Sequence, residues 1–190
     1  MIVEKIGTCI SLYRDVFRAD MFIDALEKEC EDDWSELQWN NSGTGSGSIN
    51  SYRTSVSVPL GTLFPPFKKT ELATIFHDTV RGPIEKVVKD YIEEYFIPNG
   101  ISEEWQVLKY YEGAEYKGHF DHGPNAPRVF SMVAVLKAPE EGGNLEFPNF
   151  STEVEIKDGM VILFPSNFPY IHIAHPVKKG IKYSLVTWFR

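Results

Sequence analysis

The tripeptide His119-Phe120-Asp121 places an imidazole and a carboxylate two residues apart. On a β-strand, residues i and i+2 point to the same face, so these two side chains would converge on one point. Such a pair supplies two of the three protein ligands of a facial triad, which holds Fe(II) and leaves other coordination positions open. The tripeptide alone is a weak signal, because a chain with five histidines can show it by chance. A metal site therefore requires a third ligand.

Two histidines further along the chain, His172 and His175, are candidates for that ligand. Residues 169–189 read as two antiparallel strands joined near residues 177–180. A hairpin with that centre would set His172 opposite Lys182 on a shared face. The ammonium would then extend past the metal and bind the far carboxylate of a diacid. His175 has odd spacing from His172 and would face the other way, so His172 is favoured.

The motifs together resemble the prolyl 4-hydroxylase-like branch of the 2-oxoglutarate/iron dioxygenases. The resemblance covers roughly residues 52–190 and is strongest from residue 105. The family pattern Tyr-x-x-Gly-x-x-Tyr-x-x-His-x-Asp is met by Tyr110, Gly113, Tyr116, His119 and Asp121. Further family features follow in the same order: Gly142-Gly143 before Phe147-Pro148, the run from Gly159 to Phe164-Pro165-Ser166, and His172 four residues before Pro176-Val177.

The resemblance implies roles for individual residues. It implies that Fe(II) is held by His119, Asp121 and His172, with 2-oxoglutarate and O2 as cosubstrates and ascorbate as a possible reductant. Lys182 follows His172 by ten residues, as the family's cosubstrate-binding cation does. The remaining implied contacts are Tyr110 and Ser184 for 2-oxoglutarate, and Arg53 and Tyr116 for substrate. Arg53 begins an Arg-Thr-Ser segment like the family's upstream strand.

Some of these residues have simpler interpretations. Tyr110 is equally a core tyrosine whose hydroxyl is satisfied elsewhere, and Lys182 is alternatively an exposed strand lysine. Val135 stands where many relatives have a tyrosine, and Asn144 and Leu145 stand near a position where a threonine lines the site in some relatives. At these positions the chain departs from the family pattern.

The function expected from the resemblance is hydroxylation of a C–H bond, in a prolyl residue of a peptide or protein. A dioxygenase acting on a non-prolyl substrate is the nearest alternative. A non-catalytic jelly-roll module that binds a metal or a partner is another, but such a module needs no cosubstrate anchor like Lys182. Two histidines and a carboxylate also suit catalytic zinc. No glutamate stands beside the ligands as in His-Glu-x-x-His, and a zinc hydrolase leaves Lys182 unexplained.

The elements that must position these residues follow from the hydrophobic pattern. Apolar spacing predicts helices over 20–38, with Asp20 as N-cap, and over 70–96, with a kink at Gly82-Pro83. A strand is expected at 52–58. Short β-rich runs separated by turns are expected after Gly100, at 105–111, 129–137, 144–147, 153–156, 160–164, 169–174 and 181–189.

This pattern predicts a mainly β fold with flanking α. A double-stranded β-helix (jelly-roll) core over about 101–190 would rest on helical support over about 1–100, in one domain of residues 1–190. The polar segment 40–51 is either a lid over the substrate or a surface connection.

Charge and composition limit the partners. The formal net charge of −8 argues against sequence-independent binding of nucleic acid. No run of 18 apolar residues is present, so no membrane span is expected. Residues 1–5 lack the features of a secretion signal. Two cysteines, Cys9 and Cys30, are too few for a disulfide scaffold, which favours a reduced, cytoplasmic location.

Overall fold

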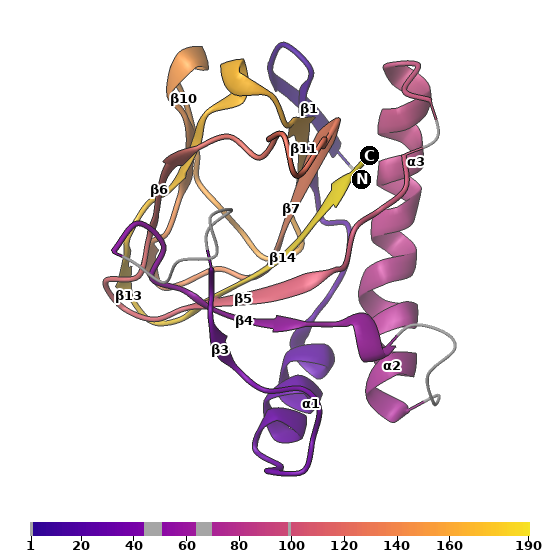
Figure 1. The fold of residues 1–190 in the computed structure, drawn as a ribbon, viewed down its shortest axis with the longest axis vertical. Coiled ribbons are helices and arrows are strands. Elements are labelled where there is room, and N and C mark those ends of the chain that lie inside the picture. Colours follow the sequence, from indigo (N-terminus) through magenta and orange to yellow (C-terminus); the bar gives the residue numbers. More distant parts are fainter. Residues whose placement is uncertain (1, 44–50, 64–69, 99) are drawn as a thin grey trace.

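The structure is a computed structural model that describes residues 2–43, 51–63, 70–98 and 100–190. Two β-sheets face each other, and the helices lie on the outer side of the larger one (Figure 1). The mainly β jelly-roll predicted from the sequence is confirmed. The predicted loop at 40–51 falls partly on residues 44–50, outside the described residues.

The large sheet has eight strands in the order β1-β2-β11-β7-β14-β5-β4-β3. Their bounds are Ile2–Gly7 (β1), Ile10–Arg14 (β2), Val161–Pro165 (β11), Phe130–Lys137 (β7), Lys182–Phe189 (β14), Gln106–Tyr110 (β5), Val56–Pro59 (β4) and Asn40–Asn41 (β3). The strand expected at 52–58 therefore begins later, and two residues of the expected loop form β3, which pairs with β4.

The small sheet has four strands in the order β10-β9-β12-β6, and a separate two-stranded ladder joins β13 to β8. Their bounds are Thr152–Val154 (β10), Leu145–Phe147 (β9), His172–Ala174 (β12), Tyr116–His119 (β6), Val177–Lys179 (β13) and Glu141–Gly142 (β8). Strand β6, which carries His119, is not among the β-rich runs expected from the sequence.

The first two strands correct the expectation that residues 1–100 are only helical support. β1 and β2 form a hairpin, and β2 pairs with β11 of the large sheet. The hairpin turn passes through Cys9 at φ 56°, a left-handed conformation that Asn or Gly adopts more readily. Because the turn lacks the usual Asn-Gly signal, the sequence pattern did not reveal the hairpin.

The helices differ from prediction mainly at their ends. Helix α1 spans Asp20–Cys30, eight residues shorter than expected, and Ala19 rather than Asp20 occupies the N-cap. After Cys30 the chain turns, and side-chain bonds such as Trp34 N–H to Asp32 Oδ1 replace the helical ladder.

The second helical segment changes from π-helical to α-helical geometry at Gly82-Pro83, where a kink was predicted, and its backbone stays helical throughout. Helix α2 spans Glu71–Ile75, a π-helical turn spans Phe76–Arg81 and helix α3 spans Gly82–Glu94. The Gly82 N–H donates to the His77 carbonyl five residues back, and Pro83, which has no N–H, begins the following helix. Three 3-10 turns complete the described elements, at Gly61–Leu63, Pro148–Phe150 and Phe168–Tyr170.

Alternation along β14 divides the large sheet into two faces. Tyr183 and Leu185 belong to the hydrophobic cluster that includes the helices. Lys182 and Ser184 alternate with these two residues along the strand, so their side chains point to the other face. They are buried in the space between the two sheets. One face of the sheet is therefore a hydrophobic core, and the other carries buried polar groups.

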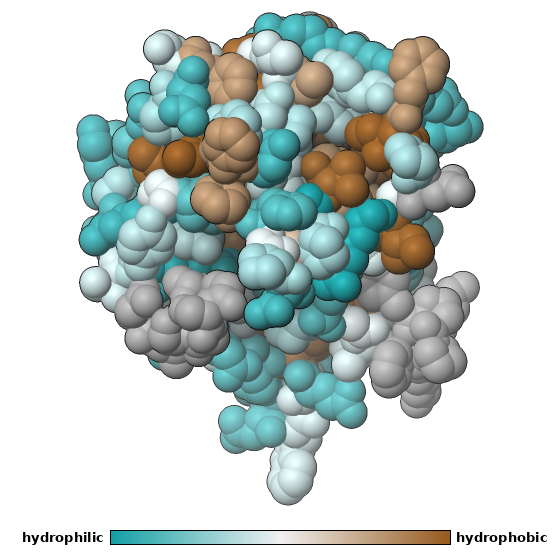
Figure 2. Space-filling model, turned by 45° about the horizontal axis from the view of Figure 1, so that its top comes forward, coloured by the Kyte–Doolittle hydropathy of each residue, from teal (hydrophilic) through white to brown (hydrophobic). Residues whose placement is uncertain are grey.

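The surface shown in Figure 2 is mostly polar, and apolar residues reach it in separate small groups. Among the described residues, no helix is both long enough and apolar enough to cross a membrane.

Candidate metal centre

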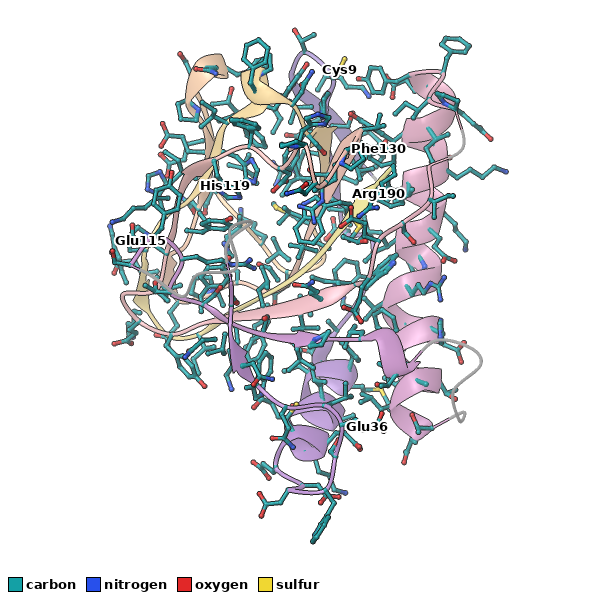
Figure 3. The ribbon with its side chains drawn as sticks, in the orientation of Figure 1. Cys9, Glu36, Glu115, His119, Phe130 and Arg190 are labelled. Carbon is teal, nitrogen blue, oxygen red and sulfur yellow. The ribbon has the colours of Figure 1, made fainter. Side chains whose placement is uncertain are left out.

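The three predicted metal ligands meet between the two sheets. His119 ends β6 and His172 begins β12, and the two residues are direct partners in the antiparallel register. Asp121 lies two residues beyond β6. Its carboxylate oxygens are 3.6 Å from His119 Nε2 and 3.7 Å from His172 Nε2. One ligand atom from each residue lies within 4.8 Å of the others. Figure 3 labels His119 among the side chains between the sheets.

Both imidazoles are oriented by a backbone carbonyl. His119 Nδ1 is 2.8 Å from the Lys117 carbonyl oxygen, and His172 Nδ1 is 3.2 Å from that of Tyr170. A carbonyl can only accept, so each Nδ1 carries the proton and each Nε2 keeps its lone pair. Both lone pairs are on the side of Asp121. This is how metal-binding histidines are commonly held.

The Asp121 carboxylate is fixed by two donors. The Ser131 hydroxyl donates to Oδ2 over 2.6 Å, and the Trp188 side chain also hydrogen-bonds the carboxylate. Burial alone would raise the pKa of Asp121, but His172, His119 and these hydrogen bonds outweigh it and lower the pKa. Burial, together with the neighbouring His172, lowers the pKa of His119 to about 3. A charged carboxylate and a neutral imidazole are the forms that bind a metal.

The predicted hairpin between His172 and Lys182 is wrong. Strand β12 pairs with β6 and β9, whereas β14 pairs with β5 and β7 in the other sheet. The short strand β13 between them pairs with β8, which separates the two strands. His172 and Lys182 nevertheless line the same pocket, because the two sheets face each other.

Lys182 is buried in that pocket without an acidic partner. It is 3% exposed, and its Nζ donates to the Gly143 carbonyl over 2.6 Å. No described carboxylate forms an ion pair with it. Burial lowers the pKa of Lys182 to about 8. A buried cation with donors to spare fits the far carboxylate of 2-oxoglutarate.

Ser184 and Tyr110 lie beside this lysine. The Ser184 hydroxyl is buried and has no hydrogen-bond partner among the described residues, so it can donate to a carboxylate. Tyr110 is the register partner of Lys182, whose Nζ is 5.1 Å from the Tyr110 ring centroid. Burial raises the pKa of Tyr110, and its hydroxyl shares a hydrogen bond with Ser55. The orphaned hydroxyl and the unpaired cation together fit an anionic cosubstrate.

Arg53 and Tyr116 line the same pocket. The Arg53 guanidinium lies 4.8 Å from the centroid of the Tyr116 ring, and that ring stacks on the His119 imidazole. The guanidinium also donates to the Gly43 carbonyl over 2.9 Å and to the Ser55 hydroxyl over 3.3 Å. Both residues are therefore placed beside the metal centre.

His175, the alternative to His172, faces away from the centre, with Nε2 2.7 Å from a Glu146 carboxylate oxygen. Two other polar residues near the motif also lie elsewhere. His122 contacts the Arg128 carbonyl. Arg128 forms a bidentate pair with Glu103, and its guanidinium covers the Trp188 ring at 3.7 Å from the ring centroid.

Trp188 and Ser131 are the site residues that sequence reasoning missed. Trp188 is not among the site residues expected from the sequence. It lies on the same alternating face of β14 as Lys182 and Ser184, and lines the pocket. The period of two along β14 was the signal that could have identified it. Ser131 had no comparable signal.

Comparison with known proteins finds a family model that matches part of the chain. Residues 105–190 match the model of the 2OG-Fe(II) oxygenase superfamily. Two curated relatives come from Arabidopsis thaliana. Probable prolyl 4-hydroxylase 9 is 28% identical over 138 residues, covering 57% of this chain and 48% of the relative. Probable prolyl 4-hydroxylase 3 is 30% identical over 144 residues, which cover 58% of this chain and 49% of the relative. The chain thus spans about half the length of these relatives.

Solved structures share the fold over most of this chain. A viral collagen prolyl hydroxylase from Paramecium Bursaria Chlorella virus-1, in a 2OG complex, has a TM-score of 0.66 and 24% identity, and the match covers 97% of each chain. A Pseudomonas putida prolyl-4-hydroxylase has a TM-score of 0.67 and 22% identity, and the match covers 95% of this chain and 92% of that one. A Trichoplax adhaerens prolyl hydroxylase, in complex with a hypoxia inducible factor peptide, has a TM-score of 0.69 and 16% identity, covering 95% and 82%.

Proposed function

We propose that this protein is an Fe(II)- and 2-oxoglutarate-dependent dioxygenase that hydroxylates a C–H bond, because residues 105–190 match the model of the 2OG-Fe(II) oxygenase superfamily. The observation that carries the proposal is one pocket with two kinds of unsatisfied group. His119, Asp121 and His172 offer three metal ligands, and Lys182 offers a buried cation without a carboxylate partner.

The bound iron and 2-oxoglutarate would supply the oxidising chemistry, with O2 as the oxidant and succinate and carbon dioxide as co-products. The chain's own residues do the positioning. His119, Asp121 and His172 would hold the metal, each through one side-chain atom. Lys182 and Ser184 hold the far carboxylate of 2-oxoglutarate, and Tyr110 borders it. Burial of these groups excludes water and strengthens each charged contact.

The proposed substrate is a prolyl residue in a peptide or protein. Two curated relatives are named as probable prolyl 4-hydroxylases, and one structural neighbour is a prolyl hydroxylase bound to a peptide. Arg53 and Tyr116 are the proposed substrate contacts, because they border the metal centre and line the pocket. A net charge of −8 suits a peptide better than a nucleic acid.

Two further features belong to the same proposal. Ascorbate is the proposed reductant, as it would return the iron to Fe(II). A cytoplasmic location is supported by Cys9 and Cys30, which form no disulfide.

The test is release of succinate from 2-oxoglutarate in the presence of Fe(II), with and without proline-containing peptides. Mass spectrometry would detect a gain of one oxygen atom in the peptide. His119→Ala, Asp121→Ala and His172→Ala should each abolish turnover and weaken iron binding. His175→Ala is the matched control, because its imidazole faces away from the centre. Iron binding without succinate release would favour a non-catalytic metal module, and activity retained in His172→Ala would refute the ligand set.

A further inference from the structure

A column of aromatic rings leads from the proposed metal ligand His119 to the surface. The rings of His119 and Tyr116 stack with centroids 3.5 Å apart and planes 19° from parallel. Tyr52 meets Tyr116 edge to face, with ring centroids 6.3 Å apart. Tyr52 is 41% exposed. The two phenols therefore link a ligand position to solvent through rings in van der Waals contact or close to it.

The backbone holds this column in place. Arg53 forms an isolated β-bridge with Tyr116, and the Lys117 N–H donates to the Tyr52 carbonyl over 3.0 Å. The Tyr52 hydroxyl also donates to the Gly118 carbonyl, one residue before His119. Both phenols are thus tied to the strand that carries the ligand, so their spacing does not depend on rotamer changes at the surface.

The other two ligands have poorer routes for an electron. His172 is flanked by Phe164 and Phe147, with ring centroids at 4.8 and 6.1 Å, and phenylalanine is hard to oxidise. Trp188 hydrogen-bonds Asp121, but no described aromatic ring contacts it to continue a path to the surface, and the Arg128 guanidinium covers its ring, 3.7 Å from the ring centroid. Among the described residues, Tyr116 is the oxidisable ring stacked directly on a ligand.

We propose that Tyr116 and Tyr52 form a relay that carries oxidising equivalents from the metal centre to the surface when no substrate is bound. The inference rests on the proposed function, which supplies the oxidant: an iron centre oxidised by O2 and 2-oxoglutarate. Each step moves one electron from Tyr52 through Tyr116 to the iron. On oxidation, the Tyr52 phenol gives the proton that it shares with the Gly118 carbonyl to water. A one-electron reductant in solution, such as ascorbate, then supplies an electron and a proton and restores the phenol. Two such steps return the iron centre to Fe(II), with the bound oxygen leaving as water after uptake of two protons.

The charge on Arg53 sets the direction of the relay. Its guanidinium lies 4.8 Å from the Tyr116 ring centroid, so a positive hole there is disfavoured. Tyr116 lies between His119 and Tyr52 and is only partly exposed. Tyr52 is 41% exposed and lies beyond the Arg53-covered ring of Tyr116, further from the ligands. The oxidising equivalent therefore passes through Tyr116 and rests on Tyr52, away from the ligands.

The experiment uses the iron-loaded protein with 2-oxoglutarate and O2 but no peptide. Freeze-quenched samples are examined by electron paramagnetic resonance, and oxidised residues are mapped by mass spectrometry. The wild type should show a tyrosyl radical and oxygen added at Tyr52, and ascorbate should suppress both. Tyr52→Phe should move the modification to Tyr116. Tyr116→Phe should lose the Tyr52 product and inactivate after fewer uncoupled turnovers.

A second arm replaces 2-oxoglutarate and O2 with hydrogen peroxide, which oxidises bound iron directly. A chain that releases no succinate would refute the proposed function, while the peroxide map still decides the relay. Tyr111 is the matched control, because it is 47% exposed and has no stacking contact with a ligand. Equal modification of Tyr111 and Tyr52, a Tyr52 product that persists in Tyr116→Phe, or a product mainly on Trp188 would overturn the relay.

Discussion

Two buried lysines lie on neighbouring rungs of one ladder and face opposite sides of the large sheet. Lys109 pairs with Tyr183, and Lys182 pairs with Tyr110. Lys109 faces the helices, where its Nζ lies 2.9 and 3.0 Å from the Glu27 carboxylate oxygens. Three aromatic rings surround it, those of Trp39, Tyr111 and Tyr183. Lys182 faces the pocket and has only the Gly143 carbonyl as a hydrogen-bond acceptor.

The two environments push the lysine pKa values apart. Burial alone would lower the pKa of Lys109, but hydrogen bonding with Glu27 and Tyr183 outweighs it and raises the pKa. Burial lowers the pKa of Lys182 to about 8 because nothing acidic compensates. On the helix side of the sheet, the charge of Lys109 is paired with Glu27, and the pair stabilises the fold. On the pocket side, the charge of Lys182 has no acidic partner and is available to an anionic ligand.

The largest expected effect is loss of stability in Lys109→Met. Removing the ammonium leaves Glu27 without its partner, and breaking a buried pair this way costs about 3–5 kcal/mol. Glu27 is 30% exposed and can rehydrate, so a fall of about 2–3 kcal/mol in the free energy of unfolding is expected. Urea denaturation measures it. Lys89→Met, which breaks an exposed pair with Glu93, is the control and should cost under about 1 kcal/mol. Equal losses in the two variants would remove the contrast between the two faces.

Lys182→Met should change stability in the opposite direction. The lowering of its pKa from 10.5 to about 8 corresponds to about 3 kcal/mol of destabilisation at neutral pH. Loss of the bond to Gly143 offsets about 1 kcal/mol of the gain, so unfolding should become harder by about 2 kcal/mol. Binding of 2-oxoglutarate should weaken by about 1.5–3 kcal/mol, which is roughly 10- to 150-fold. Thermal melting with and without 2-oxoglutarate measures both. A variant that melts lower yet binds 2-oxoglutarate normally would contradict the assignment.

The same contrast predicts a pH dependence. The folded-state pKa of Lys182 lies below its unfolded value, so the burial penalty is complete below about pH 8 and fades as pH rises towards 10.5. The stability gain of Lys182→Met should therefore shrink between pH 7 and pH 10. Affinity of the wild type for 2-oxoglutarate should fall above about pH 8, because the amine becomes neutral. The pKa of Lys109 is raised, so its contribution persists across this window and is lost only at higher pH. A gain that stays constant from pH 7 to 10 would show that Lys182 is not responsible.

The smallest expected effect concerns two hydroxyls on opposite faces of β14. Ser184→Ala should weaken 2-oxoglutarate binding by about 0.5–1.5 kcal/mol and leave stability unchanged or slightly higher, because the hydroxyl has no partner without ligand. Thr187 donates to the Glu103 carbonyl over 2.9 Å. Thr187→Val should therefore cost about 1 kcal/mol of stability and leave 2-oxoglutarate binding alone. Denaturation measures stability and calorimetry measures 2-oxoglutarate binding. A loss of stability in Ser184→Ala together with weaker binding in Thr187→Val would contradict the assignment of the two faces.

The sequence predicted which residues form the site better than it predicted which strands pair with one another. The local period of a strand predicted that His119 and Asp121 converge, and their side chains do meet, although β6 ends at His119 and Asp121 lies beyond it. The strands that flank β12 and β14 could not be predicted, because pairing depends on contacts between segments far apart in the chain. His172 lies beside His119 rather than Lys182, and β13 separates the strands that the predicted hairpin had joined. The prediction that His172 and Lys182 lie close to one site is met, because both line the same pocket. The hairpin pairing from which it was predicted does not occur.

Other parts of the fold carried too little local signal. The β1–β2 hairpin turns through Cys9, which is not a typical turn residue. Helix α1 ends at Cys30, although apolar residues continue beyond it, because side chains such as Asp32 bond the backbone instead. The role of Trp188 was hidden in a run of apolar and aromatic residues that also suits a core strand.

The segment that carries Tyr52 and Arg53 also protects an open sheet edge. Strand β6 is the last strand of the small sheet, and backbone bonds from residues 52–54 cover its outer side. The Thr54 N–H donates to the Glu115 carbonyl, and the Lys117 N–H donates to the Tyr52 carbonyl, each over 3.0 Å. An uncovered edge of this kind is a template for pairing with another chain. Loosening residues 52–54 would therefore expose the histidine-bearing strand to self-association, and aggregation would accompany loss of the site.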